Sequence, residues 1–544
     1  MATISKPTCS ILTGLLASYG IERAVVSPGS RNAPLLVSME RSGNFAISTV
    51  VDERTAAFVA LGMAKQTSKP VALVCTSGSA MLNYGPALAE AYYSRTPLIA
   101  ITADRPGEWI DQRDSQTIRQ NGALDAVVRK SVEIDERMSL RQVNRLINEA
   151  LTAATGNIPG PAHINVPLDA PLTTMAQESE MPVGNRISTV RCRQEVPDDV
   201  FRLLTRSKKI MFIAGAGADV NPLSVRLPDN SVWFSDRFGG EQAGISALAA
   251  GVLLNRADDE KKAMLRPDFV VNLGGTLIDD KFKACLRRWQ SPVINIGFDD
   301  NMVDTFGSLH MQIECNASDF VEQWNAYVCR NYGHTVSDQP GYCRHWRDFI
   351  SASERGVAGL PWCDIEAMRM LAMNFNGGEL FASNGMCARY AQLMPWKVDR
   401  IHYNRGVSGI DGCTSTAAGI SMATERTVLL LTGDMSFGYD IGALVLKNLR
   451  GNFKIAVFDN GGGDIFRHVA TTASLPERET RFAVPVEQPV AQLATAFGFD
   501  YYLADGNSGT ADALVAFLRG SEKPAILHII TDIESNQKAY NILT

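Results

Sequence analysis

Residues 427–437 read TVLLLTGDMSF, and residues 453–463 read FKIAVFDNGGG. In each stretch a short apolar run is followed at once by polar and small residues. Runs of this kind are typical of buried parallel strands in α/β proteins. The carboxyl ends of parallel strands meet at one edge of a sheet, so we expect Asp434 and Asn460 to present two oxygen ligands at that edge.

These oxygen ligands favour a magnesium ion that carries a diphosphate. Mg²⁺ takes a few protein oxygens, and phosphate oxygens complete its octahedron. Glycines 461–463 let the backbone approach a ligand closely. The residues after Asp434 are expected to open a helix, whose free N–H groups can face phosphates. From these residues alone, two ordinary turns in an α/β sheet are an equally good interpretation.

The size and composition of the chain indicate an ordinary globular protein. At 544 residues it is too long for one core, and about three domains are expected. The hydrophobic share of 45% and the charged share of 20% are unexceptional. A net charge of -6 without a basic run argues against nucleic-acid binding. No segment approaches about 18 uninterrupted apolar residues, so no membrane span is predicted.

The ten cysteines are irregularly spaced and form no CxxC pair. They indicate reduced, mostly buried thiols rather than a disulfide framework or a zinc site. The first ten residues lack the basic-then-apolar pattern of a secretion signal. We therefore expect a cytoplasmic protein.

Strand-like and helix-like segments alternate regularly, which predicts an α/β fold built from three doubly wound parallel-sheet domains. The domains are expected over residues 1–180, 190–345 and 360–544, with irregular linkers at 171–197 and 330–365. The first and third domains share a pattern of segments. Strands are predicted at residues 24–26, 46–51, 71–75, 97–102 and 162–167 in the first domain, at 209–215, 269–274 and 293–296 in the second, and at 427–432, 453–458 and 524–531 in the third.

Polar residues at strand ends of the first domain have both a structural and a functional interpretation. The Pro-Gly turn of residues 27–34 projects Arg31 from the end of a strand, where α/β sheets bind ligands, although a solvated loop cation fits equally well. Glu53 opens a helix, where an acid ordinarily complements the helix dipole. His163 lies in an apolar strand and is expected to be a core histidine.

Six motifs in sequence order carry a resemblance to one family. They read SPGSRNAP at 27–34, DERTAAF at 52–58, TADRP at 102–106, QTIRQ at 116–120, NRGVSGIDG at 404–412 and GGGDIF at 461–466. Asn460 also follows Asp434 by 26 positions, which resembles the diphosphate motif of thiamine diphosphate (ThDP) enzymes, with Met435 in place of the usual glycine. Together these features resemble the 2-succinyl-5-enolpyruvyl-6-hydroxy-3-cyclohexene-1-carboxylate (SEPHCHC) synthases of menaquinone biosynthesis. The resemblance runs nearly end to end and is weakest in the middle domain.

The resemblance implies a pyrimidine-binding first domain, a central domain and a diphosphate-binding third domain. Glu53 would hydrogen-bond the cofactor's pyrimidine ring, and Ile410 would hold the cofactor bent. Mg²⁺ or Mn²⁺ would be held by Asp434, Asn460 and the Gly462 carbonyl. The implied cofactor-binding residues are Glu53, Ser408, Gly409, Ile410, Gly433, Asp434, Met435, Ser436, Asn460, Ile465 and Phe466. The site would form between two chains of a homodimer or homotetramer.

The family reaction decarboxylates 2-oxoglutarate and adds the succinyl carbanion equivalent to isochorismate. Both substrates are dicarboxylates, which the planar fork of arginine grips well. The resemblance assigns catalytic roles to Ser30, Arg31, Glu53, Gln116, Arg389 and Arg405. It assigns substrate binding to Arg31, Arg105 and Gln116 on the isochorismate side, to Arg389 and Arg405 on the 2-oxoglutarate side, to Lys281, and to Ile465 and Phe466 as walls.

Two departures from the family pattern concern substrate recognition. The family's Ser-Lys-Arg aligns with residues 279–281, which read DDK, or, with a shift of one residue, Lys281 takes the lysine position. The family's Asn-Ser is Asn384-Gly385 in this chain. A ThDP-dependent decarboxylase or carboligase with another acceptor is therefore a second hypothesis. A cofactor-binding scaffold without catalysis is a third, and the presence of Glu53, Asp434 and Asn460 argues against it.

Overall fold

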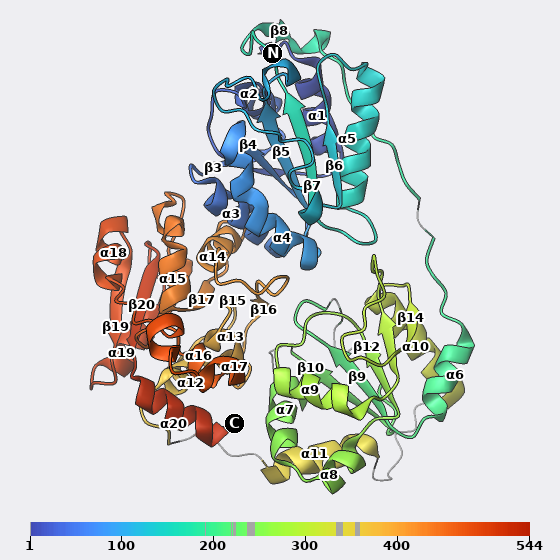
Figure 1. Cartoon of the computed structure of the whole chain (residues 1–544), viewed down its shortest axis with the longest axis vertical. Helices are drawn as coiled ribbons and strands as arrows, with labels where there is room; N and C mark the ends of the chain where they lie inside the picture. The colour runs from blue at the N-terminus through green and yellow to red at the C-terminus, as the bar shows by residue number, and fades with distance from the viewer. Residues whose placement is uncertain are drawn as a thin grey trace.

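The computed structural model describes residues 2–190, 192–218, 220, 225–236, 245–332, 341–353 and 359–543. It contains three six-stranded sheets, each parallel throughout and flanked by helices. Figure 1 shows them as three lobes that follow one another along the chain. The predicted α/β fold class is confirmed. Within the described part of the chain, no helix is long and apolar enough to cross a membrane.

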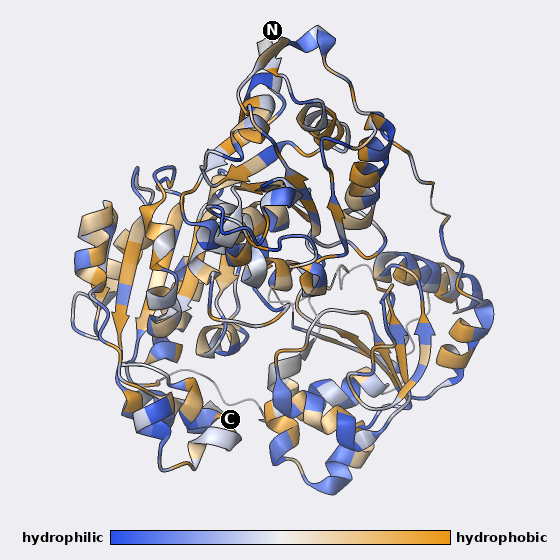
Figure 2. Cartoon of the chain, turned by 45° about the horizontal axis from the view of Figure 1, so that its top comes forward, coloured by the Kyte–Doolittle hydropathy of each residue, from blue (hydrophilic) through white to orange (hydrophobic). Residues whose placement is uncertain are grey.

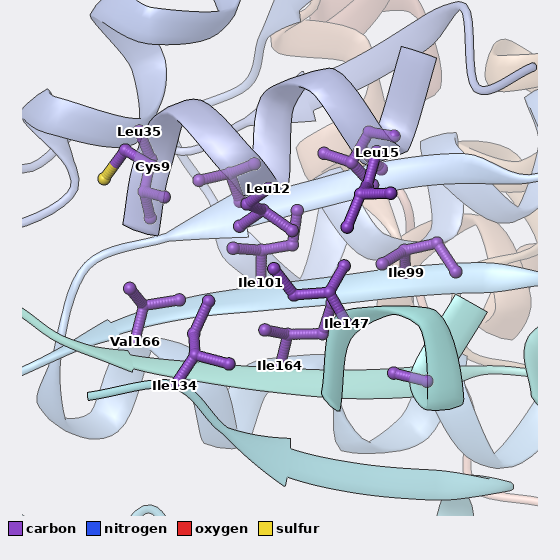
Figure 3. Close-up of a cluster of buried hydrophobic side chains, with 14 of the residues drawn as sticks. Cys9, Leu12, Leu15, Leu35, Ile99, Ile101, Ile134, Ile147, Ile164 and Val166 are labelled. Atoms are coloured by element: carbon purple, nitrogen blue, oxygen red, sulfur yellow. The ribbon is translucent and has the colours of Figure 1, made fainter. Parts of the chain in front are cut away.

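The first sheet has the strand order β3-β2-β4-β5-β7-β6. Its strands are β2 (Arg23–Val26), β3 (Ala46–Thr49), β4 (Val71–Cys75), β5 (Leu98–Asp104), β6 (Lys130–Glu133) and β7 (Ala162–Pro167), and its helices are α1 (Pro7–Ser18), α2 (Ala33–Ser42), α3 (Glu53–Thr67), α4 (Gly85–Tyr93) and α5 (Leu140–Ala154). On one face, Leu12 and Leu15 of α1 and Ile147 of α5 pack over Ile99 and Ile101 of β5 (Figure 3). His163 is fully buried in β7, as predicted.

The second sheet has the order β11-β10-β9-β12-β13-β14, which is the arrangement of a dinucleotide-type doubly wound sheet. Its strands are β9 (Ile210–Ala214), β10 (Ser231–Ser235), β11 (Ile245–Ser246), β12 (Phe269–Asn272), β13 (Val293–Ile296) and β14 (Leu309–Ile313). Its helices are α6 (Asp198–Arg206), α7 (Ala247–Arg256), α8 (Asp259–Leu265), α9 (Asp280–Trp289), α10 (Ala317–Tyr332) and α11 (Tyr342–Ser353).

The third sheet has the order β16-β15-β17-β18-β20-β19. Its strands are β15 (Glu379–Ala382), β16 (Arg400–His402), β17 (Val428–Gly433), β18 (Phe453–Asp459), β19 (Asp500–Ala504) and β20 (Ala525–Ile530). Its helices are α12 (Asp364–Asn374), α13 (Met386–Ala391), α14 (Cys413–Met422), α15 (Asp434–Tyr439), α16 (Ile465–His468), α17 (Ala470–Ala473), α18 (Val490–Phe497), α19 (Thr510–Leu518) and α20 (Ile533–Leu543). The first and third sheets wind identically, which explains their shared sequence pattern. Figure 2 shows strands that are mostly hydrophobic and flanking helices that carry both hydrophobic and hydrophilic residues.

Both stretches that were expected to be irregular contain regular structure. In 171–197, β8 (Met175–Gln177) pairs antiparallel with β1 (Ala2–Ile4). In 330–365, α11 packs on the second sheet, although residues 333–340 and 354–358 lie outside the described part. Trp346 of α11 is fully buried, with its ring centroid 4.8 Å from that of Phe234. The linker prediction was wrong for residues 342–353, because their apolar residues form one helix face and are interspersed with polar residues in the sequence.

The first and third sheets of one chain are joined through α3 and α14. A Cβ atom on Gly62 of α3 would overlap the carbonyl oxygen of Thr416, and one on Gly419 of α14 would overlap that of Val59. Such close helix packing requires glycine at both crossing points. The crossing sets α3 against α14 (Figure 1), and Arg54 at the start of α3 donates a hydrogen bond to the Tyr439 carbonyl of the third domain.

Candidate cofactor and substrate site

The ends of β17 and β18 are joined directly at the edge of the third sheet. Asp434 follows β17, and its two carboxylate oxygens accept hydrogen bonds from the backbone nitrogens of Met435 at 2.6 Å and Gly462 at 2.7 Å. Asn460 follows β18 on the neighbouring strand. The structure thus brings together Asp434, Asn460 and Gly462. The Met435 N–H, which was expected to face phosphates, is bonded to the Asp434 side chain.

The electrostatics at this edge suit a cation. Burial raises the pKa of Asp434 to about 6, and the nearby Asp459 and Asp364 carboxylates also raise it. A bound divalent cation would offset this accumulation of negative charge. The side-chain oxygen of Asn460 accepts no hydrogen bond from the described residues. Carboxylate, amide and carbonyl oxygens are the donor set that Mg²⁺ takes, so Asp434 and Asn460 fit the ion.

Gly462 fits the ion less completely than the other two residues. Its carbonyl oxygen accepts a hydrogen bond from Nη1 of Arg467 at 3.2 Å, which uses one of its two lone pairs. Its backbone φ of +99° lies in the region that favours glycine, and a Cβ atom would overlap the carbonyl oxygen of Val484. The turn therefore depends on glycine at this position, whichever group its carbonyl faces.

A loop that contains Ile410 is fixed next to the diphosphate stretch. The Ser436 hydroxyl donates to the Ile410 carbonyl at 2.8 Å. Nδ2 of Asn384, which follows β15, donates to the carbonyls of Asn404 and Gly409, each at 2.6 Å. Ser408 takes a left-handed backbone with a φ of +61°. These bonds hold residues 404–410 against the carboxyl ends of β15 and β17, with Gly433 at the end of β17.

Two arginines meet beside this loop. Nη1 of Arg405 donates to Oδ1 of Asn384 at 3.1 Å, and Nη1 of Arg389 donates to the Gly385 carbonyl at 2.9 Å. Burial, and secondly the charge of Arg389, lower the pKa of Arg405. Nε of Arg405 is buried without a hydrogen-bond partner, and Arg405 forms no ion pair within the described ranges. A guanidinium in this state is prepared to bind an anion.

The central domain places an acid beside the arginines. Asp280 opens α9, and its carboxylate lies 3.8 Å from Nη2 of Arg389 and 2.7 Å from Nζ of Lys283. Although burial raises the pKa of Asp280, the hydrogen bond from Lys283 and the charges of the two arginines lower it. Asp279 caps α9, since its side chain accepts a hydrogen bond from the backbone nitrogen of Lys281 at 2.6 Å.

Lys281 is the second residue of α9, directly after Asp280. Its Nζ is 5.8 Å from the ring centroid of Tyr540, and burial lowers its pKa. Ile465 and Phe466 are half-buried after the glycine turn, and the Phe466 ring lies 5.8 Å from that of Phe482. The structure thus brings Arg389 and Arg405 together beside Asp280, and it places Lys281 against Tyr540 of α20.

Among the described residues, no hydrogen bond or ion pair joins the predicted site residues of the first domain to those of the other two. Nη1 of Arg31 donates to the Leu168 carbonyl at 2.9 Å, and burial, then the charge of Arg105, lower the pKa of Arg31. Nη1 of Arg105 lies 3.3 Å from Oδ2 of Asp114. Ser30 and Gln116 are exposed. Gln116 has a left-handed φ of +53°.

Glu53 is the first residue of α3, after the capping residue Asp52. In the described part of the chain, its carboxylate forms no hydrogen bond or ion pair, and none joins it to Asp434 or Asn460. The adjacent Arg54 does contact the third sheet, since its Nη2 donates to the Tyr439 carbonyl at 3.2 Å. The Glu53 carboxylate is therefore available to a ligand or to another chain.

Sequence reasoning missed a clamp between the first and third sheets. Glu90 of α4 is buried, and its carboxylate accepts from the backbone nitrogens of Gly406 at 3.0 Å and Val407 at 2.8 Å. Nζ of Lys65 lies 3.2 Å from the same carboxylate and donates to the Tyr403 carbonyl at 2.6 Å. The only available signal was an acid on an otherwise apolar helix. The two backbone nitrogens that it binds lie more than 300 positions away.

The cysteines are consistent with the expectation from their spacing. All ten are free, and all but Cys192, Cys329 and Cys343 are buried. Among the described residues, no group of His, Cys, Asp and Glu side chains forms a ready metal cluster. Any metal at the diphosphate edge would depend on amide or carbonyl oxygens as well as on Asp434.

Comparisons with known proteins show which family the chain resembles. The family model described as "Thiamine pyrophosphate enzyme, N-terminal TPP binding domain" matches residues 8–123. A protein of Porphyromonas gingivalis named 2-succinyl-5-enolpyruvyl-6-hydroxy-3-cyclohexene-1-carboxylate synthase is 35% identical, over 97% of this chain and 94% of its own. Proteins of the same name from Desulfotalea psychrophila and Bacteroides thetaiotaomicron are 32% and 31% identical, over 97% and 96% of this chain and 99% and 95% of their own. The chain belongs to the family of SEPHCHC synthases, which are thiamine diphosphate enzymes.

Proposed function

We propose that this chain is the SEPHCHC synthase of a menaquinone pathway. It decarboxylates 2-oxoglutarate, releases CO₂, and joins the remaining succinyl unit to the ring double bond of isochorismate. The product's name contains both parts, a 2-succinyl group and a cyclohexene carboxylate. The reaction makes the chain a carbon–carbon bond-forming transferase.

The observation that carries this proposal is the state of Arg405. Its guanidinium is half-buried with an unpartnered, buried Nε, next to a second cation, Arg389, and it forms no ion pair among the described residues. Asp280 lies 3.8 Å from Arg389 but is largely exposed and offsets only part of this positive charge, so the two adjacent cations favour a further anionic partner. The distal carboxylate of 2-oxoglutarate supplies that partner, whereas pyruvate has no second carboxylate.

The chain's own residues divide the work between two regions. Arg389, Arg405 and Lys281 bind the 2-oxoglutarate side, and Ile465 and Phe466 exclude water from the reacting carbon. Arg31 and Arg105, with Ser30 and Gln116, bind the carboxylates and hydroxyl of isochorismate. Bound ThDP supplies the electron sink that decarboxylation needs.

The cofactor is held at both of its ends. Glu53 hydrogen-bonds its pyrimidine ring, Ile410 supports its bent form, and the residues around Gly433 and Ser436 face its diphosphate. We propose Mg²⁺, or Mn²⁺ in its place, with Asp434, Asn460 and the Gly462 carbonyl as protein ligands.

We propose that the complete site forms between two chains, in a homodimer or homotetramer. This is supported by the free carboxylate of Glu53 and by the separation of the two arginine groups within one chain. In this view residues 1–180 bind the pyrimidine and residues 360–544 the diphosphate. Residues 190–345, together with α11, form the central domain. The free cysteines suit a reducing cytoplasm.

The test is incubation of the purified protein with ThDP, Mg²⁺, 2-oxoglutarate and isochorismate. We expect isochorismate to disappear at the rate at which CO₂ is released. CO₂ release without loss of isochorismate would point to another acceptor. Cofactor binding without CO₂ release would point to a scaffold.

A further inference from the structure

A buried carboxylate lies directly behind the predicted metal ligand Asn460. Asp364, the first residue of α12, is 2% exposed and lies 96 positions before Asn460 in the sequence. Its Oδ2 accepts a hydrogen bond from Nδ2 of Asn460 at 2.9 Å. Its Oδ1 accepts from the Thr531 hydroxyl at 2.6 Å, and its backbone nitrogen donates to Oδ1 of Asn536 at 2.8 Å. Nδ2 of Asn536 in turn donates to Thr531 Oγ1 at 3.1 Å, which closes the cluster.

This cluster dictates which end of the Asn460 amide faces outward. The two ends of an asparagine amide have nearly the same shape but opposite hydrogen-bonding character. A carboxylate can only accept hydrogen bonds, so Asp364 can pair with the NH₂ group of Asn460 and not with its oxygen. The oxygen is thereby turned to the opposite side of the amide, and no described residue donates a hydrogen bond to it.

This orientation lets the side-chain oxygen of Asn460 face a cation, which is bound by oxygen lone pairs. With the reverse orientation, Asn460 would present two N–H groups to a divalent ion and repel it. Thr531 bonds the other carboxylate oxygen and Asn536 accepts from the backbone nitrogen, so neither competes for the oxygen that faces Asn460. An uncharged residue could fill the same volume without the cost of burying an acid.

We propose that Asp364 is a positioning residue that selects the amide orientation of Asn460, and through it the affinity for the divalent cation. This rests on the proposed function, because that proposal makes Asn460 a metal ligand. Asp364 itself touches neither the cation nor a substrate. Partners of this kind typically change metal affinity by ~10–100-fold when they are replaced.

The test compares D364N, N460D and the double variant D364N/N460D, with T531V as the matched control. In D364N the new amide can offer either end to Asn460, so both orientations become available. In N460D two carboxylates face each other. The double variant again pairs one NH₂ group with one carboxylate, but the amide is now at position 364 and the carboxylate at position 460. T531V removes a hydrogen bond to Asp364 but leaves its contact with Asn460.

The readout is the Mg²⁺ concentration at half-saturation of ThDP binding, followed by calorimetry without either substrate, together with Mn²⁺ binding by electron paramagnetic resonance. We expect each single variant to raise that concentration about 10-fold or more, and the double variant to recover most of the loss. T531V should lower the melting temperature and leave the Mg²⁺ concentration within about twofold of the parent.

Two results would overturn the proposal. One is a D364N protein with unchanged Mg²⁺ dependence, and the other is a double variant no better than either single one, which would indicate a packing role. A parent protein that binds ThDP without Mg²⁺ would remove the metal assignment, and the proposal with it. Since no substrate is present, failure of the synthase reaction alone leaves these readouts unaffected.

Discussion

The backbone nitrogen of Gly462 donates a hydrogen bond to Oδ2 of Asp434 at 2.7 Å. The two residues are 28 positions apart, and each follows the end of a strand, β18 and β17. The hydrogen bond holds the glycine turn after β18 against the start of α15. The carboxylate of Asp434 thus has a fixed orientation before any ligand arrives. Preorganisation of this kind reduces the entropy that binding must overcome.

The pKa of Asp434 makes the metal-free protein sensitive to pH. Burial raises it from 3.8 to about 6, so the folded protein holds this proton more tightly than the unfolded chain. The protonated Asp434 therefore stabilises the folded state. This contribution is complete below about pH 4 and is lost as the pH rises through about 6. We expect D434N to gain on the order of 2 kcal/mol relative to the parent between pH 4 and pH 7 in EDTA.

Melting curves of both proteins at several pH values measure this difference. Only its change with pH matters, because the substitution also alters local hydrogen bonds by a constant amount. Addition of Mg²⁺ and ThDP should remove the loss of stability in the parent. Parallel curves for the two proteins from pH 4 to pH 7 would contradict the assignment of this titration to Asp434.

Glu53 is predicted to be essential for turnover and dispensable for folding. Its carboxylate forms no hydrogen bond in the described part of the chain, so E53Q removes no internal contact. We expect turnover to fall by ~10²-fold or more, as is usual when a proton-transfer partner is lost. Size-exclusion chromatography and melting temperature should match the parent. Near-normal activity would remove Glu53 from the mechanism.

The two arginine groups are predicted to serve different substrates. R405A should raise the KM for 2-oxoglutarate far more than that for isochorismate, because Arg405 lies beside Arg389 in the third domain. R31A, at the end of β2, is the matched control and should show the opposite preference. Steady-state kinetics with each substrate varied in turn would measure both. The reverse pattern would overturn the assignment of the arginines.

Asp280 is predicted to compete with the substrate for Arg389. Its carboxylate lies 3.8 Å from Nη2 of Arg389 and is largely exposed. Exposed ion pairs contribute ~0.2–1 kcal/mol, so D280N should lower the KM for 2-oxoglutarate by up to about fivefold. The effect should shrink at high salt. A KM that rises instead would mean that Asp280 positions Arg389 rather than competes for it.

The sequence predicted those features that depend on local pattern. The apolar runs before Asp434 and Asn460 are buried strands, and the polar residues at their ends meet because parallel strands end at one edge. The linker at 330–365 was mispredicted because Trp346 and Phe349 of α11 are spaced as a helix face among charged residues. The structure also explains Gly385, whose φ of +96° would strain the serine expected from the family.

Contacts between distant residues could not be predicted from the sequence. Asp364 opens a helix and has the appearance of an ordinary first-turn acid. Its contact with Asn460 depends on how α12 packs beneath the third sheet. The amide end that Asn460 presents is a property of this packing, and no pattern within one segment encodes it.

Glu90 is predicted to act on substrate binding through the loop of residues 403–407. Gln at position 90 keeps one acceptor but turns an NH₂ group towards a backbone N–H, and it leaves Lys65 without its ionic partner. A buried group left unsatisfied costs about 1–3 kcal/mol, so E90Q should lower the melting temperature and raise the KM for 2-oxoglutarate.

The double variant E90Q/K65M removes the unpaired charge as well. We expect it to recover part of the stability but not the KM, because the bonds to Gly406 and Val407 remain altered. Recovery of both would show that the ion pair alone matters, and an unchanged KM in E90Q would show that Arg405 does not depend on this clamp.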